Sequence, residues 1–236
     1  MIILHEPKII FVRGMKVAST SFEHALSRFA TPTSIVTFKG RAKFERDYFP
    51  IFINPNYDKD TVKFYHHMPV KELKEILSED VFKGYNKIAI MRNPFDRIIS
   101  AFFWARYFNP DNPSSLNKPP ELPLEEMRLH FQEWIFSDSE RNHYNNDDIY
   151  KIDNNYEIDT FIRYEHLEHD IKQLENQNPM LENLWNIFSR MKAKSEYRPK
   201  EATVEFMFKG FPSGIDLICS TCVGEIEKFE YTIPNT

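Results

Sequence analysis

The segment from residue 8 to residue 29 constrains the fold of this chain more than any other. It opens with the apolar run Ile9–Val12, rich in β-branched residues, which predicts a buried strand. It closes with apolar residues at i, i+3, i+4 and i+7 over residues 22–29, which predicts an amphipathic helix. A basic loop, residues 13–21, joins them. The pattern predicts a strand, a loop and a helix N-terminus, and the start of a helix readily binds an anion.

The loop of residues 13–21 carries groups suited to a phosphate. Lys16 supplies a mobile cation, and hydroxyl residues open the predicted helix. The loop differs from the nucleoside-triphosphate motif G-x-x-x-x-G-K-[ST], because its lysine precedes the hydroxyls and only Gly14 is near. We interpret it as a phosphate cradle; a strand–turn–helix with a capping Ser or Thr is the alternative. The residues expected to contact the phosphate are Arg13, Gly14, Lys16, Val17, Ala18, Ser19, Thr20 and Ser21.

A second strand, turn and helix is predicted at residues 86–103. The run NKIAIM at residues 86–91 indicates a strand. Asn93 is a good N-cap, and Pro94 suits the first helical position. An apolar stripe at i, i+3, i+4, i+7 and i+8 from Phe95 then predicts a helix with one buried face.

The whole chain of 236 residues is long enough for one α/β domain with a sizeable core. Predicted strands alternate with helices and no repeat or boundary is visible, which favours a parallel sheet covered on both faces. We expect a single domain over residues 1–236, with a proline-rich loop insertion around 109–123 and a hairpin around 150–158. Further strands are predicted at Ser34–Phe38, Val62–Tyr65 and Phe161–Tyr164.

Composition and charge argue against nucleic-acid binding, a disulfide-rich fold and a membrane span. The net charge of −5 argues against nonspecific binding of nucleic acid. Two cysteines form no disulfide framework, which favours a reducing compartment. Cys219 and Cys222 match C-x-x-C, but both fall on the apolar stripe of the predicted last helix, which favours packed thiols. No apolar run approaches ~20 residues, so we expect no transmembrane segment and a soluble, cytoplasmic chain, which could still be part of a longer protein.

The stretch RNPFDRIISAFF, residues 92–103, resembles the 3′-phosphate-binding motif R-[ND]-P-x-x-R-x-x-S-x-[FY] of sulfotransferases, whose donor is 3′-phosphoadenosine 5′-phosphosulfate (PAPS). The order Lys-x-x-Ser-Thr-Ser over residues 16–21 resembles their 5′-phosphosulfate loop. The segments YHHMPVKELKEIL, FIRYEHLEHDI and EIEKFEY are similar to parts of the carbohydrate (membrane-type) sulfotransferases and their soluble bacterial relatives. The resemblance runs in order along nearly the whole chain, with one departure at Met15, where many relatives have Pro.

This resemblance implies a three-layer α/β fold of the P-loop-kinase-like type, with a central parallel sheet of four to five strands. It implies that Arg92 and Ser100 bind the 3′-phosphate of PAPS, as bidentate Arg contacts suit phosphate. Arg198 follows a predicted helix and is a further candidate for a phosphate contact. We expect Arg97 to form a helix salt bridge instead, because it points a half-turn away from the side of Ser100.

The expected reaction moves a sulfuryl group in line from PAPS to an acceptor hydroxyl. Lys16 is the candidate for stabilising the leaving phosphate. His67 is the candidate general base and His66 the second choice; packing of both histidines at a strand end is the alternative. A sulfuryl group carries less charge than a phosphoryl group, so we expect no metal requirement.

The expected partners are PAPS, its product adenosine 3′,5′-bisphosphate (PAP) and a hydroxyl-bearing acceptor, with no nucleic acid. A glycan is favoured because the nearest resemblance is to carbohydrate enzymes and because Trp104, Tyr107 and Phe108 lie beside the second motif. Two alternatives stay open: a nucleotide-dependent kinase of P-loop type, and a non-catalytic anion-binding relative.

Overall fold

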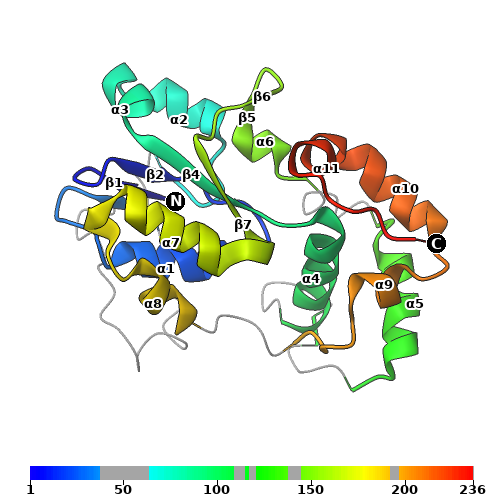
Figure 1. The fold of residues 1–236 in the computed structure, drawn as a ribbon. Helices are drawn as coiled ribbons and strands as arrows, with labels where there is room; N and C mark the ends of the chain where they lie inside the picture. The colour runs from blue at the N-terminus through cyan, green and yellow to red at the C-terminus, as the bar shows by residue number, and fades with distance from the viewer. Residues whose placement is uncertain (38–63, 109–114, 117–120, 138–144, 192–196, 236) are drawn as a thin grey trace. The chain divides into compact units, whose positions relative to one another are not determined.

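The computed structural model describes residues 1–37, 64–108, 115–116, 121–137, 145–191 and 197–235 (Figure 1). The chain divides into two compact units. Unit 1 comprises Met1–Met91 and Asp148–Ala193, and unit 2 comprises Arg92–Asp147 and Lys194–Thr236.

Unit 1 is built on a five-stranded sheet in the order β3-β1-β2-β4-β7. Its strands are β1 (Ile2–Leu4), β2 (Ile9–Phe11), β3 (Ile35–Val36), β4 (Asn86–Met91) and β7 (Thr160–Arg163). Strand β4 pairs in parallel with β2 on one side and with β7 on the other. The predicted fold class is confirmed: the sheet is mostly parallel and belongs to a mixed α/β fold.

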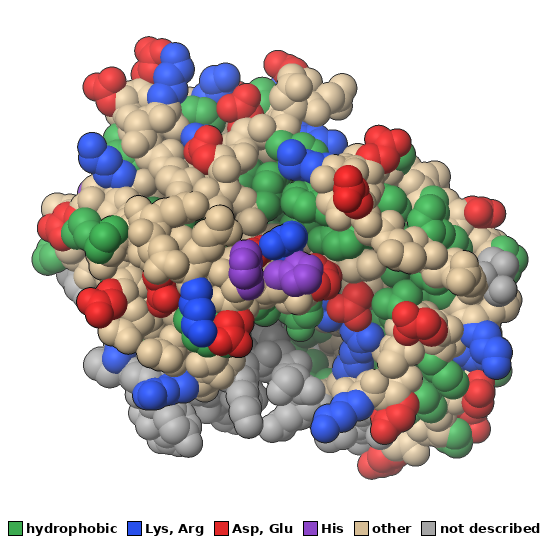
Figure 2. All heavy atoms as spheres, in the orientation of Figure 1, with side chains coloured by type: hydrophobic (Ala, Val, Ile, Leu, Met, Phe, Trp, Pro, Cys, Tyr) green, Lys and Arg blue, Asp and Glu red, His purple; other side chains and the backbone are tan. Residues whose placement is uncertain are grey.

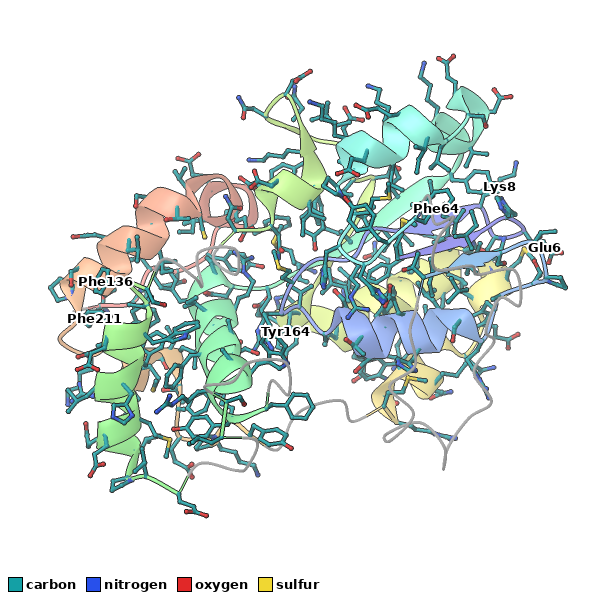
Figure 3. All side chains as sticks on the ribbon, turned by 180° about the vertical axis from the view of Figure 1, so that it is seen from behind. Glu6, Lys8, Phe64, Phe136, Tyr164 and Phe211 are labelled. Atoms are coloured by element: carbon teal, nitrogen blue, oxygen red, sulfur yellow. The ribbon has the colours of Figure 1, made fainter. Side chains whose placement is uncertain are left out.

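Strand β1 was not predicted, and it runs antiparallel to both of its neighbours. Its three apolar residues are too short a run to separate from a turn by periodicity. A tight connection containing Glu6 and Lys8 (Figure 3) returns the chain into β2, and Lys8 has a φ of 52° there. The hairpin register Ile3↔Ile10 therefore adds a strand beside β2 without a crossover helix.

Helices cover both faces of the sheet in unit 1 (Figure 1). On one side lie α1 (Ser19–Ser27), α7 (Leu167–Gln177) and α8 (Leu184–Ser189), and on the other α2 (Val70–Ile76) and α3 (Glu79–Gly84). Side chains alternate between the faces of a strand, so every second residue enters the α1 side of the core. That core joins Ile2, Leu4, Ile9, Phe11, Ile88, Ile90 and Ile162 to Phe22, Leu26, Ile171, Leu174, Leu184 and Phe188.

Short elements complete unit 1. Helix α6 (Asp147–Tyr150) begins at the last residue of unit 2 and leads into the antiparallel pair β5 (Lys151–Ile152) and β6 (Asn155–Tyr156). The buried hydroxyl of Tyr150 donates to the carbonyl of Ile90 at 3.0 Å, which fixes α6 to β4. Two 3₁₀ turns, η2 (Tyr164–His166) and η3 (Pro179–Leu181), flank α7.

Unit 2 is helical among its described residues. It contains α4 (Pro94–Tyr107), α5 (Leu124–Trp134), α9 (Val204–Phe208), α10 (Pro212–Thr221) and α11 (Val223–Phe229). As predicted, the Asn93 side chain caps α4, accepting from the Phe95 N–H at 2.9 Å. The core is aromatic: Phe95, Phe102, Phe103, Phe131 and Phe208 are fully buried. Phe136 packs edge-on against Phe211, with ring centroids 5.8 Å apart (Figure 3).

Three predicted elements differ from the structure or lie outside it. The predicted last helix is divided at Cys222, whose φ and ψ of −114° and 26° separate α10 from α11. Phe64 and Tyr65, the described part of the predicted strand at 62–65, are not in a strand. Most of the loop at 109–123 lies outside the described residues. Among the described helices, none combines the length and apolar character needed to cross a membrane.

Candidate functional site

The loop of residues 13–21 follows β2 in unit 1 and ends in α1. Pairing with β4 continues one residue past β2, since the N–H of Val12 donates to the carbonyl of Ile88 at 2.8 Å. Lys16 and Ala18 then adopt left-handed backbone conformations, with φ of 59° and 62°. Such conformations are costly for residues other than glycine and cluster at functional sites. In P-loops, successive N–H groups in turn conformations form a concavity that binds anions.

Hydrogen bonds hold this loop to itself. The Ser19 hydroxyl, which is buried, donates to the carbonyl of Gly14 at 2.8 Å. The Thr20 hydroxyl accepts from Nη2 of Arg13, also at 2.8 Å. Ser19 and Thr20, which are predicted to contact a phosphate, therefore also stabilise the conformation of the loop. Val17 and Ser21 are buried, and Lys16 is half-buried.

The Arg13 guanidinium pairs with Glu23, a buried carboxylate on α1. Glu23 also pairs with the amino group of Met1. Burial acts to raise the pKa of Glu23, but these two positive neighbours outweigh it and hold that pKa below its ordinary value. Sequence reasoning missed Glu23. It supplies the counter-charge that keeps Arg13 at the start of the loop.

His67 lies beside the same loop and is also in unit 1. Its Nδ1 is 3.1 Å from the carbonyl oxygen of Arg13. The backbone of His67 is left-handed, with a φ of 58°, so His67 is not part of a strand. Helix α2 begins three residues later. His66 and His67 thus lie in a turn before α2, and the expectation that they follow a strand end is wrong for the described residues.

The pKa of His67 is lowered to about 3, first by burial and then by the charge of Arg13. His67 is therefore neutral at physiological pH, as a general base must be before it acts. His24 on α1 is similar: burial lowers its pKa to about 4.

The second group of predicted residues lies in unit 2, around the start of α4. Arg92 donates to Asp96 through Nε, at 2.6 Å, and its Nη2 forms an ion pair with the same carboxylate at 2.6 Å. Arg198 reaches the other carboxylate oxygen through Nη1, again at 2.6 Å. Arg92, Asp96 and Arg198 thus form one cluster, here called the arginine cluster. Both of its arginines were predicted from the sequence, and Asp96 was not.

Asp96 is ionised within the arginine cluster. Burial acts to raise its pKa, but Arg92 and Arg198 outweigh that effect and hold the pKa below its ordinary value. Ser100 is half-buried and lies one helical turn beyond Asp96 on α4, a spacing that places the two residues on one face.

Arg97 forms a salt bridge, as predicted, but its partner lies on another helix. It is completely buried, and its Nη1 lies 2.5 Å from Oε2 of Glu225 on α11. The same carboxylate accepts from the N–H of Asn146 at 2.8 Å. Burial raises the pKa of the neighbouring Cys222 thiol to about 12, so this thiol is protonated. Cys219 and Cys222 are free cysteines that belong to or border the core of unit 2.

The aromatic residues proposed for glycan contact divide into two groups. Tyr107 is buried and stacks on Phe103 with a centroid distance of 5.8 Å, which makes it a core residue. Phe108 packs against Tyr197, with ring centroids 4.7 Å apart, and both rings are half-buried. Trp104 is half-buried as well.

Charged side chains of both signs are mixed over the face shown in Figure 2, where Lys and Arg are interspersed with Asp and Glu. Within the described part of the chain, no group of three or more His, Cys, Asp or Glu residues has an arrangement that could hold a metal ion.

A mostly parallel sheet flanked by helices, with a basic loop after one central strand, is the architecture of a sulfotransferase-like α/β protein. A sequence model of the sulfotransferase family matches residues 1–211. The chain therefore belongs to the sulfotransferase family, and membership supports an enzyme that transfers a sulfuryl group. Searches of curated proteins and of solved structures gave no significant match.

Proposed function

We propose that this protein transfers a sulfuryl group from PAPS to a hydroxyl group of a carbohydrate. The observation that carries the proposal is the loop of residues 13–21, with Lys16 and two left-handed residues before the N-terminus of α1, in a chain of the sulfotransferase family. We propose that residues 1–236 act as one sulfotransferase domain.

The loop of residues 13–21 binds the 5′-phosphosulfate end of the donor. The left-handed conformations of Lys16 and Ala18 suit backbone N–H groups that converge on an anion. The N-terminus of α1 adds the positive end of a helix dipole. Arg13 supports the loop through Glu23 and Thr20, while Lys16 interacts with the oxygen that bridges phosphorus and sulfur.

Arg92, Ser100 and Arg198 bind the 3′-phosphate end. Two guanidinium groups and a hydroxyl offer charge-assisted hydrogen bonds to a phosphate dianion. Arg92 follows β4 directly in the sequence, and the loop of residues 13–21 follows β2, the strand that pairs in parallel with β4.

Transfer then proceeds in line. The acceptor oxygen forms a bond to sulfur as the bond from sulfur to the bridging phosphate oxygen breaks. Lys16 stabilises the charge that develops on this phosphate, and PAP leaves. Because a carbonyl oxygen only accepts, Nδ1 of His67 carries its proton toward Arg13, which leaves a lone pair on Nε2. That lone pair takes the proton of the acceptor hydroxyl.

A thermal-shift comparison tests the donor assignment. We expect PAP to raise the melting temperature more than ATP with magnesium does, because ATP lacks the 3′-phosphate. Lys16→Ala is expected to retain its fold and lose transfer. A larger shift with ATP and magnesium, together with phosphoryl transfer, would instead identify a kinase. Binding of PAP without transfer to any acceptor would identify a non-catalytic relative.

A further inference from the structure

We propose that Asp96 is a positioning residue that makes the arginine cluster selective for a nucleotide with a ribose 3′-phosphate. The inference rests on the proposed function, because it assigns the source of selectivity at the 3′ end of the donor. Asp96 acts through Arg92 and Arg198 and need not touch the ligand.

The two oxygens of Asp96 are divided between the two arginines. Oδ2 accepts from Nε of Arg92, at 2.6 Å, and Oδ1 accepts from Nη1 of Arg198, also at 2.6 Å. One planar carboxylate therefore sets the spacing of two guanidinium groups that are 106 positions apart in the sequence. Carboxylate and guanidinium geometry is directional, so the pair is fixed in orientation as well as in distance.

Without Asp96, Arg92 and Arg198 would not stay close to each other. Two guanidinium groups repel each other, and the Arg92 side chain is only 8% exposed, so water screens it poorly. The ionised carboxylate of Asp96 places one negative charge between them. Asp96 and Arg198 retain exposures of 24% and 23%, which leaves this end of the cluster accessible to a ligand.

A second anchor makes the arrangement rigid. Arg198 donates through Nε and Nη2 to the carbonyl of Ala202, at 2.9 and 2.6 Å. Asp96 lies in the first turn of α4, where the helix dipole favours a carboxylate. The cluster is thus prepared before the ligand arrives, and a phosphate with several acceptor oxygens can use both arginines without reorganising them.

Asp96→Asn tests this role with almost no change in side-chain volume. An amide offers one acceptor oxygen and one donor nitrogen, so its NH₂ group faces the N–H groups of one arginine. That arginine must move away, and the pair is lost. Helix α4 keeps its Asn93 cap and its Pro94 start, so the fold has local support in the variant.

The experiment measures dissociation constants of PAP and of AMP, which differ by the 3′-phosphate, for the full chain by calorimetry. The ratio of the AMP constant to the PAP constant reports the 3′-phosphate contact alone. We expect Asp96→Asn to lower this ratio about tenfold or more, with little change for AMP. Asp96→Glu, which keeps the charge, should retain part of the ratio. Glu79→Gln is the charge-matched control, because it removes a carboxylate from the exposed pair with Lys83 and should leave the ratio unchanged.

A double-mutant cycle separates positioning from general damage. If Asp96 acts through both arginines, Asp96→Asn should lower the ratio by a smaller factor in an Arg198→Ala background than in the wild type, because only its contact with Arg92 is then left to lose. An unchanged or higher ratio in Asp96→Asn would overturn the inference. A wild-type ratio near one would overturn the proposed 3′-phosphate site itself, so the two failures are distinguishable.

Discussion

The Nδ1 atom of His67 lies 3.1 Å from the carbonyl oxygen of Arg13, the residue that opens the 13–21 loop. This contact fixes the tautomer of the imidazole, and it holds the candidate base against the candidate phosphate loop within unit 1. The geometry is therefore set by the backbone of the loop itself.

The first prediction concerns this histidine. His67→Asn keeps a side-chain donor for the Arg13 carbonyl and tolerates the left-handed backbone, but it cannot take a proton from the acceptor. We expect kcat to fall about 100- to 10,000-fold with KM for PAPS nearly unchanged. Steady-state kinetics with His66→Asn in parallel check this. If His66→Asn loses activity and His67→Asn keeps it, the assignment of the base is reversed.

The second prediction concerns acid stability. The pKa of His67 is about 3 and that of His24 about 4 in the folded protein, both below the ordinary 6.5 because of burial. At a pH between the folded-state pKa of each histidine and 6.5, the unfolded chain binds more protons than the folded one. The contribution of these histidines to the free energy of unfolding is therefore complete above about pH 6.5 and falls as pH decreases. Each histidine contributes a slope of up to about 1.4 kcal/mol per pH unit.

Urea denaturation between pH 7 and pH 4.5 measures this slope. The carboxylates with lowered pKa, such as Glu23 and Asp96, contribute mainly below that range. His67→Asn should make the dependence shallower. A wild-type free energy of unfolding that stays level, or that rises toward pH 4.5, contradicts the predicted burial of these histidines.

The third prediction addresses the backbone of the loop at Ala18, whose φ is 62°. A β-branched residue is strained there, whereas glycine is not. We expect Ala18→Val to lower the free energy of unfolding by about 1–3 kcal/mol and to weaken AMP binding, while Ala18→Gly retains binding. Equal AMP affinity in both variants would mean that this backbone conformation does not serve the 5′-phosphate.

The fourth prediction concerns the ion pair between Arg97 and Glu225, both of which are completely buried. Removing one partner leaves an uncompensated charge, so Arg97→Met should lower stability by about 3–5 kcal/mol. The double variant Arg97→Met/Glu225→Met removes both charges and should lose less. Denaturant titration of the three proteins checks this. A double variant at least as unstable as the single one would contradict the account of the pair.

Much of the fold could be predicted from local patterns. Strand β4 was predicted from the apolar run at residues 86–91, and the start of α4 from Asn93 and Pro94. Both predictions succeed because a buried strand and a helix cap are determined by residues that are neighbours in the sequence. Strand β1 depends on pairing with β2, and its three residues alone carry no periodicity. The break at Cys222 was hidden because the apolar spacing continues across it from α10 into α11.

The cationic residues of the candidate site were easier to predict than their acidic partners. Lys16 and Arg92 stand in motifs, whereas Glu23 and Asp96 matter through pairs that folding creates. Asp96 had one readable signal, its i, i+4 spacing from Arg92. Its second partner, Arg198, is 102 positions away. The left-handed backbone of His67 and its contact with Arg13, 54 positions away in the sequence, are likewise contained in no local pattern.

Transfer of labelled sulfuryl groups from PAPS to a panel of glycans, phenols and lipids is the most direct test of the central claim. It is run with the wild-type chain, Lys16→Ala and Arg92→Ala. We predict that the wild type sulfates a glycan hydroxyl, that Lys16→Ala abolishes turnover, and that Arg92→Ala raises KM for PAPS. Full activity in Lys16→Ala, or no transfer from PAPS to any acceptor by the folded wild type, would contradict the account.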